Sequence, residues 1–98
     1  MMMLLDEIAA NKTQVLALGK RYGARRIRVF GSVARREERP DSDVDFLVDF
    51  PCGYDMFSQR LPLTEGLADL LHRRVDLVPE HKLNRHIRDR VLNEAIDL

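Results

Sequence analysis

The sequence predicts an α/β (α+β) fold, in which a small mixed sheet of about three strands packs with helices. Two observations predict this class. Segments with apolar residues at helical spacing alternate with short, β-branched segments, and their order is helix, strand, helix, strand, helix, strand, helix. With 98 residues, the chain is expected to form a single domain over residues 1–98, near the lower size limit for a core without disulfides or bound metal.

The first part of the chain is expected to hold a helix, a strand and a short second helix. Apolar residues at helical spacing predict a helix over residues 4–22, kinked or broken near Asn11. The alternating, β-branched run at 26–30 predicts the first strand. Ser32 follows this strand and suits the N-cap of a short helix over 33–38.

The rest of the chain is expected to add two strands and two helices. Residues 43–50 alternate acidic and apolar side chains, which predicts a second strand, and residues 74–78 predict a third. Between them, a helix is expected from Met56 or Pro62 to Leu71, long enough for a parallel crossover that brings the starts of both strands to one sheet edge. A C-terminal helix is expected from its apolar positions, which are Leu83, Ile87, Val91, Leu92, Ala95 and Ile96.

Composition excludes several classes of function. Sixteen basic and sixteen acidic residues give a net charge of zero, which argues against a dedicated nucleic-acid binder and makes nucleic acid an unexpected main partner. Cys52 is the only cysteine, so no internal disulfide can form, which fits a reducing cytoplasm. No apolar run is long enough to span a membrane, and no membrane association is expected.

Three aspartates are candidates for a metal site. Asp43 and Asp45 are two residues apart on a predicted strand and therefore project from the same face. Asp76 would lie beside them if the second and third strands are neighbours. Carboxylates held together repel one another unless a cation compensates, and such hard oxygen ligands suit Mg²⁺. Any one of them could instead be a solvated strand residue. That explanation is weaker for Asp43 and Asp45 together, because they follow a Gly-Ser turn.

The dipeptide Gly31-Ser32 closes the first predicted strand and opens a helix. Glycine lets the backbone approach a ligand closely, and free amides at a helix start form an anion site together with a serine hydroxyl. Arg35 and Arg36 follow, and one of them could face bound phosphates while the other is a surface charge. The alternative, in which Gly31 is only a turn residue and Ser32 only a cap, stays open.

The Gly31-Ser32 pair, ten intervening residues and then Asp43-Val44-Asp45 resemble the signature of the DNA polymerase β-like nucleotidyltransferase superfamily. Further stretches are similar to its minimal (MNT) branch: 29–35, 42–48, the third-carboxylate segment 74–78, and the closing helix at 87–91 and 94–96. The resemblance therefore covers most of the chain and implies the minimal polymerase β-like nucleotidyltransferase fold.

The resemblance also implies a reaction and a set of site residues. Asp43 and Asp45 would hold two Mg²⁺ ions, and Asp76 would complete the metal site and act as base for the attacking hydroxyl. ATP would be the nucleotide donor, in a two-metal displacement. The resemblance implies that Gly31 and Ser32 bind the terminal phosphates of the nucleotide, and Arg35 is a further candidate for nucleotide binding because of its position after them.

Relatives in the minimal branch are commonly encoded beside a HEPN-domain protein, as toxin–antitoxin pairs. The resemblance therefore implies a protein adenylyltransferase (AMPylase) that acts as the antitoxin of a type VII pair. It would transfer AMP to a tyrosine of a HEPN toxin, and would form a homo-oligomer or a hetero-oligomer with that toxin. Two alternatives stay open: a non-catalytic antitoxin that neutralises its partner by occlusion, and a transferase acting on a small molecule or an RNA end. Small size disfavours the latter, because those relatives generally carry extra domains.

Overall fold

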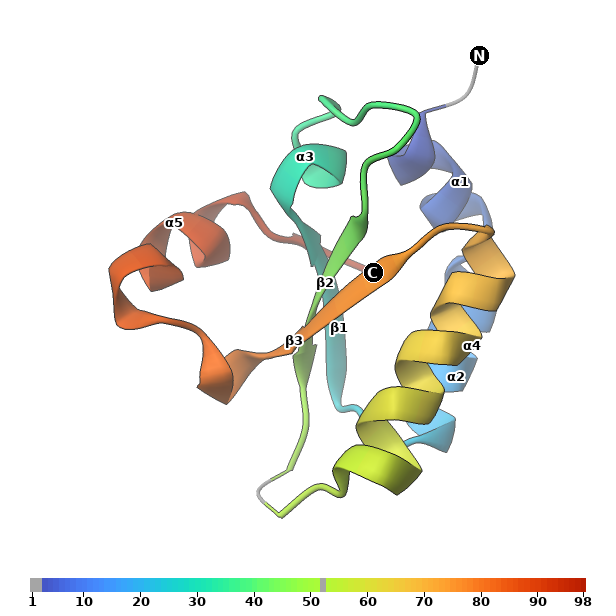
Figure 1. Cartoon of the computed structure of the whole chain (residues 1–98), viewed down its shortest axis with the longest axis vertical. Helices are drawn as coiled ribbons and strands as arrows, with labels where there is room; N and C mark the ends of the chain where they lie inside the picture. The colour runs from blue at the N-terminus through green and yellow to red at the C-terminus, as the bar shows by residue number, and fades with distance from the viewer. Residues whose placement is uncertain (1–2, 52) are drawn as a thin grey trace.

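The computed structural model describes residues 3–51 and 53–98, and in it a four-stranded sheet has helices on both faces (Figure 1). Cys52, expected to be an unpaired thiol, lies outside the described residues. The strands are β1 (Arg26–Phe30), β2 (Val44–Asp49), β3 (Val75–Pro79) and β4 (Ile96–Asp97). The α-helices are α1 (Leu4–Ala10), α2 (Lys12–Arg21), α3 (Gly31–Ala34), α4 (Leu61–Leu71) and α5 (Arg85–Glu94). Two short turns complete the chain, the π-helical η1 (Met56–Arg60) and the 3₁₀ turn η2 (Glu80–Lys82).

The sheet is mixed, as the sequence predicts, with strand order β3-β2-β1-β4. β2 runs antiparallel to β1 and parallel to β3, and β4 pairs antiparallel with β1. A parallel pair requires a crossover, and α4 supplies it between β2 and β3. The starts of β2 and β3 therefore lie at the same edge of the sheet, where Val44 pairs with Val75.

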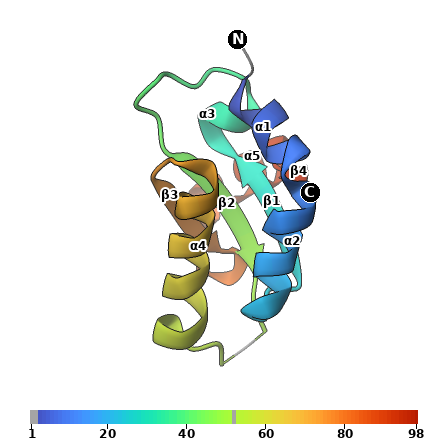
Figure 2. The ribbon, with the colours of Figure 1, turned by 90° about the vertical axis from the view of Figure 1, so that its right-hand side faces the viewer.

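Alternation along β2 divides the core between two layers. Val44, Phe46 and Val48 are buried in the main cluster together with residues of α1, α2 and α4, which cover one face of the sheet (Figure 2). Leu47 points the other way and joins a smaller cluster with Leu83 and Val91, under α5. Every second residue of β2 thus faces α5, and this series includes Asp45. Among the described residues, each helix is too short or too polar to traverse a lipid bilayer.

The N-terminal helical region breaks at Asn11, as expected. Asn11 has φ −103° and ψ 18° and separates α1 from α2. The expected helix over 33–38 with Ser32 as its cap is wrong, because α3 spans Gly31–Ala34 and its N-cap is Phe30. The helix stops early since Arg36 adopts a left-handed φ of 58° and forms a bidentate contact with Asp6 of α1.

The expected extent of the C-terminal helix is also wrong, because α5 ends at Glu94 and the chain then forms β4. Ala95 is extended, with φ −65° and ψ 136°. Ile96 pairs with Val29 across the open edge of β1, and the Asp97 carboxylate accepts two hydrogen bonds from Arg26, at 2.7 and 2.6 Å. Strand pairing with a distant segment therefore overrides the local helical pattern.

The position of Phe46 in the middle of β2 gives a test of the core. Its side chain is fully buried in the main cluster, so Phe46→Ala is expected to lower the free energy of unfolding by about 3–5 kcal/mol. Phe57 of η1, whose surface is 81% exposed, is the matched control, and Phe57→Ala is expected to change it by less than about 0.5 kcal/mol. Urea unfolding followed by circular dichroism measures both, and equal losses would contradict this assignment of the core.

Candidate active site

Asp45 of β2 and Asp76 of β3 are paired in register across the parallel strands. Residues paired in this way project from the same face of the sheet, and that face is covered by α5, since Leu47 and Val78 of the same series belong to the cluster under this helix. Asp43 precedes β2 by one residue and lies two positions before Asp45. The parallel register thus brings three carboxylates to one edge of the sheet.

The carboxylate of Asp43 forms an ion pair outside the acidic cluster. Its Oδ1 lies 3.1 Å from Nε of Arg74, and both side chains are exposed. In the described part of the chain, no three acidic, histidine or cysteine side chains are arranged closely enough to hold a metal ion as they stand. The arrangement is therefore an open acidic cluster with Asp45 at its centre, half-buried between the exposed Asp43 and Asp76.

Electrostatics single out Asp45. The pKa of Asp45 is raised to about 6, first by burial and then by the neighbouring carboxylates of Asp76, Asp43 and Glu94, while Arg35 lowers it. The cluster thus concentrates more negative charge than its surroundings neutralise. A bound divalent cation would relieve this repulsion, and carboxylate oxygens are the ligands that Mg²⁺ prefers. The donor set of Asp43, Asp45 and Asp76 therefore fits magnesium chemically.

Gly31 lies directly against this cluster. Its φ is +75°, and a Cβ atom at this position would collide with the carboxylate of Asp45. Only glycine combines this backbone conformation with so close an approach. The sequence predicts that the backbone amide of Gly31 binds phosphate. In the structure this N–H donates instead to Oε2 of Glu94, at 2.6 Å. Ser32 follows within α3 and is half-buried.

The two candidate arginines lie in different places. Nη1 of Arg35 is 3.0 Å from Oε1 of Glu94, and its Nε is 3.2 Å from Glu37. The hydrogen bonds that Arg35 donates to Glu37 and Glu94 raise the pKa of its guanidinium. Arg36 instead pairs with Asp6 of α1. Arg35 is thus the arginine beside the cluster, and Arg36 is the surface charge.

Sequence reasoning missed Glu94. It lies in a segment that resembles the closing helix of the family, but no role was predicted for it. A glutamate near the end of an amphipathic helix carries no local signal that it bonds to an amide 63 positions earlier. The contact depends on how α5 packs against α3, which only the tertiary structure shows.

The raised pKa of Asp45 predicts a pH-dependent stability in protein free of divalent ions. The folded state favours the protonated acid, since its pKa of about 6 exceeds the ordinary 3.8. Ionisation therefore removes stability as pH rises from about 4 to about 6, and the loss is complete above that range. Asp45→Asn imitates the neutral acid and is expected to stabilise the protein at pH 7 by about 1 kcal/mol, a value reduced for solvent screening of a half-buried group.

Chemical unfolding between pH 4 and pH 8 in the presence of EDTA measures this effect. The gain from Asp45→Asn is expected to disappear near pH 4. Asp49→Asn is the control, because Asp49 lies on the same strand but pairs with Arg25 at the other end. An Asp45→Asn variant less stable than wild type at pH 7 would contradict the conclusion that burial and the neighbouring carboxylates destabilise the ionised Asp45.

The contact of Gly31 with Asp45 predicts a difference between two glycine variants. Gly31 and Gly53 both have positive φ, of 75° and 84°, so the backbone conformation alone is expected to cost an alanine about 1–2 kcal/mol of stability at either position. Nothing lies within 4 Å of a Cβ at Gly53, whereas at Gly31 it collides with Asp45. Gly31→Ala alone is therefore expected to weaken Mg²⁺ binding, measured by the Mg²⁺-induced rise in melting temperature. Equal Mg²⁺ responses of the two variants would show that Gly31 does not support the cluster.

Comparisons with known proteins agree on one family. The model of the nucleotidyltransferase domain matches residues 12–98. The protein adenylyltransferase MntA of Thermococcus cleftensis is 42% identical over 96 residues, which cover 97% of this chain and 96% of that protein. A solved structure described as a minimal nucleotidyltransferase has a TM-score of 0.85 at 46% identity, over 99% of this chain and 97% of the other.

A crystal structure of a toxin–antitoxin with AMP-PNP has a TM-score of 0.74 at 24% identity, over 89% of this chain and 71% of that chain, and shares the fold. The family resemblance and the fold class predicted from the sequence are confirmed, with a fourth short strand added. From the family match and the close structural likeness, we conclude that this chain belongs to the nucleotidyltransferase domain family.

Proposed function

We propose that this chain is a Mg²⁺-dependent adenylyltransferase that transfers AMP from ATP to a tyrosine hydroxyl of a HEPN toxin and thereby acts as its antitoxin. The observation that carries the proposal is the register pairing of Asp45 with Asp76, together with the close approach of the Gly31 backbone to the Asp45 carboxylate. The similarity to the protein adenylyltransferase MntA supports the choice of AMP as the transferred group. The proposal includes a cytoplasmic location and a complex of the single domain with the toxin.

In this proposal each side chain of the site has a defined task. Asp43, Asp45 and Asp76 bind Mg²⁺, which supplies charge neutralisation for the triphosphate and lowers the pKa of the acceptor hydroxyl. The backbone of Gly31 packs directly against the Asp45 carboxylate and limits where that carboxylate can lie. Ser32 and the guanidinium of Arg35 bind the phosphates, because Ser32 lies in α3 directly after Gly31 and the charge of Arg35 acts on Asp45.

The reaction itself is a displacement at the α-phosphorus of ATP. The acceptor oxygen bonds to the α-phosphorus, the bond from this phosphorus to the oxygen that bridges the α- and β-phosphates breaks, and pyrophosphate leaves with that oxygen. Asp76 accepts the proton of the acceptor hydroxyl on its carboxylate, which is exposed and therefore reachable by a side chain of another protein. Positioning and charge neutralisation, without a covalent enzyme intermediate, supply the rate enhancement.

The open side of the acidic cluster supports a protein acceptor. Asp43 and Asp76 are exposed, and only Asp45 is partly covered. A tyrosine presented by a bound protein can therefore reach the cluster without a movement of the sheet. The toxin–antitoxin structure with AMP-PNP, which shares the fold, is consistent with a nucleotide and a toxin in one assembly.

The test is a labelling reaction with the protein encoded next to this chain as acceptor. Wild-type protein, Mg²⁺ and ATP labelled at the α-phosphate are expected to transfer label to a tyrosine of that partner and to abolish its toxicity. Asp43→Asn combined with Asp45→Asn is expected to reduce labelling by at least about a hundredfold, since the ligands that neutralise the phosphates are lost. Asp49→Asn, on the same strand but outside the cluster, is expected to label normally.

The other outcomes decide against the proposal. Full neutralisation of the partner by the double variant, with no labelling by wild type, would identify a non-catalytic antitoxin that acts by occlusion. Label on an RNA end or on a small molecule, with none on the partner protein, would identify a different transferase. Labelling that persists without Mg²⁺ would exclude the proposed metal site.

A further inference from the structure

Glu94, the last residue of α5, holds two parts of the site with one carboxylate. Its Oε2 accepts from Gly31 N–H at 2.6 Å, and its Oε1 lies 3.0 Å from Nη1 of Arg35. The Glu94 side chain is 16% exposed, so water screens these contacts weakly. Hydrogen bonds of this charge-assisted kind are about twice as strong as neutral ones. A single side chain from the end of the chain therefore fixes both the turn and the arginine.

We propose that Glu94 is a positioning residue for nucleotide binding, which holds the turn at Gly31 and the guanidinium of Arg35 in place beside Asp45. The inference rests on the proposed function, because it assigns Glu94 a part in the site that function uses. Glu94 itself touches neither nucleotide nor acceptor in this proposal. It acts through Gly31 and Arg35.

The effect reaches Asp45 through the backbone of Gly31. Gly31 lies so close to the Asp45 carboxylate that no Cβ fits between them. Any shift of the Gly31 backbone therefore changes the packing around this carboxylate. Ser32 follows Gly31 directly, so the first amides of α3 move together with the turn. Loss of the Glu94 contact is thus expected to loosen the phosphate-binding side of the site more than the carboxylates.

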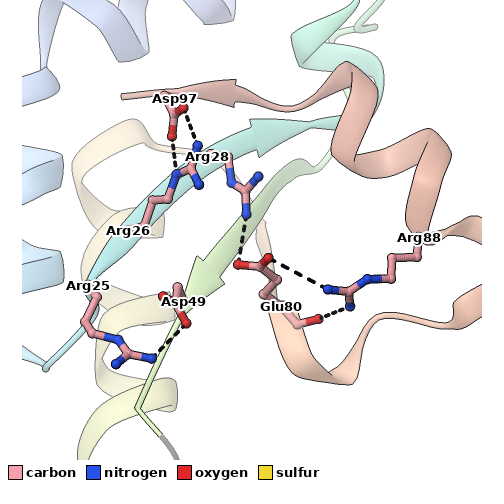
Figure 3. A network of polar contacts seen from close by, with 7 residues as sticks. All are labelled: Arg25, Arg26, Arg28, Asp49, Glu80, Arg88 and Asp97. Atoms are coloured by element: carbon pink, nitrogen blue, oxygen red, sulfur yellow. Dashed lines mark hydrogen bonds and ion pairs between the residues drawn. The ribbon is translucent and has the colours of Figure 1, made fainter.

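Contacts elsewhere on α5 hold this helix against the sheet, and Figure 3 shows the one that Arg88 makes with Glu80. Glu80 joins Arg28 of β1, at 2.9 Å, to Arg88 of α5, at 4.0 Å, and the Arg28 side chain is only 9% exposed. Arg88 also donates to the backbone carbonyl of Glu80, at 3.4 Å. Val91, one turn before Glu94, is buried against the sheet. These anchors favour a fixed support over a latch that swings away when the nucleotide enters.

The alternative role of Glu94 makes the opposite prediction. If its carboxylate occupied the place of a phosphate, removing it would free the Gly31 amide and strengthen nucleotide binding. If Glu94 positions the turn, removing it weakens binding. The sign of the change in affinity therefore separates the two roles.

The test compares Glu94→Ala, Glu94→Gln and the control Glu37→Gln. Glu37 also pairs with Arg35, at 3.2 Å, but its side chain is 65% exposed, and the Gly31 amide donates to Glu94 instead. Calorimetry with Mg²⁺ and AMP-PNP gives the dissociation constant without any acceptor. Glu94→Ala is expected to weaken this binding by about tenfold to a hundredfold, the range for a lost hydrogen bond to a charged group.

The kinetic pattern is expected to separate positioning from general damage. The KM for ATP should rise by the same factor as the dissociation constant, while kcat falls by less, because the three aspartates remain. Glu94→Gln keeps an acceptor for the Gly31 amide and is expected to recover part of the affinity. Glu37→Gln is expected to stay within about threefold of wild type. Hydrogen exchange of residues 31–35 should accelerate in Glu94→Ala but not in Glu37→Gln.

Unchanged or tighter binding of Mg²⁺ and AMP-PNP by a folded Glu94 variant would overturn the inference, as would a loss in kcat alone. If Glu94→Ala does not fold, Glu94→Gln decides by the same measurements. The two proposals fail in distinguishable ways. A wild-type protein that binds the nucleotide but labels no partner ends the proposed function alone, and one that binds no nucleotide ends both.

Discussion

The parallel pairing of β2 with β3 is the constraint on which the site depends. It places Asp45 opposite Asp76, on one face, at the edge where both strands begin. Burial of Asp45, together with repulsion between carboxylates held in this way, raises the pKa of Asp45. A parallel register cannot form without a crossover, so α4 is as necessary to the acidic cluster as the aspartates themselves.

The opposite face of the same strands supplies the stability that this repulsion opposes. Val44, Phe46 and Val48 alternate with the acidic residues and are fully buried beneath α1, α2 and α4. Because the side-chain period of a strand is two, a shift of β2 by one residue would bury carboxylates and expose the core residues. Packing on one face therefore determines the register, and the register determines the charge cluster on the other face.

Much of this arrangement could be predicted from the sequence, because it follows from local periodicity. The alternation in 43–50, the apolar spacing in α4 and the β-branched run of β1 each carry their own signal. The sequence carries no local signal for β4, for the early end of α3 or for the role of Glu94. They depend on contacts between distant segments: Asp97 with Arg26, Arg36 with Asp6, and Glu94 with Gly31. The apolar helical pattern of the sequence continues through Ile96, but α5 ends at Glu94. The helix stops there because Ile96 pairs with the edge of β1 instead.

The two-residue strand β4 has a consequence for how copies of this domain can associate. Edge strands expose backbone groups that can recruit a strand from another molecule, and short strands with charged side chains resist this. β4 is only two residues long, and the exposed pair of Arg26 and Asp97 lies across its junction with β1. This border of the sheet is therefore a poor template for a further strand, so any assembly that extends the sheet would have to begin at β3, next to the acidic cluster.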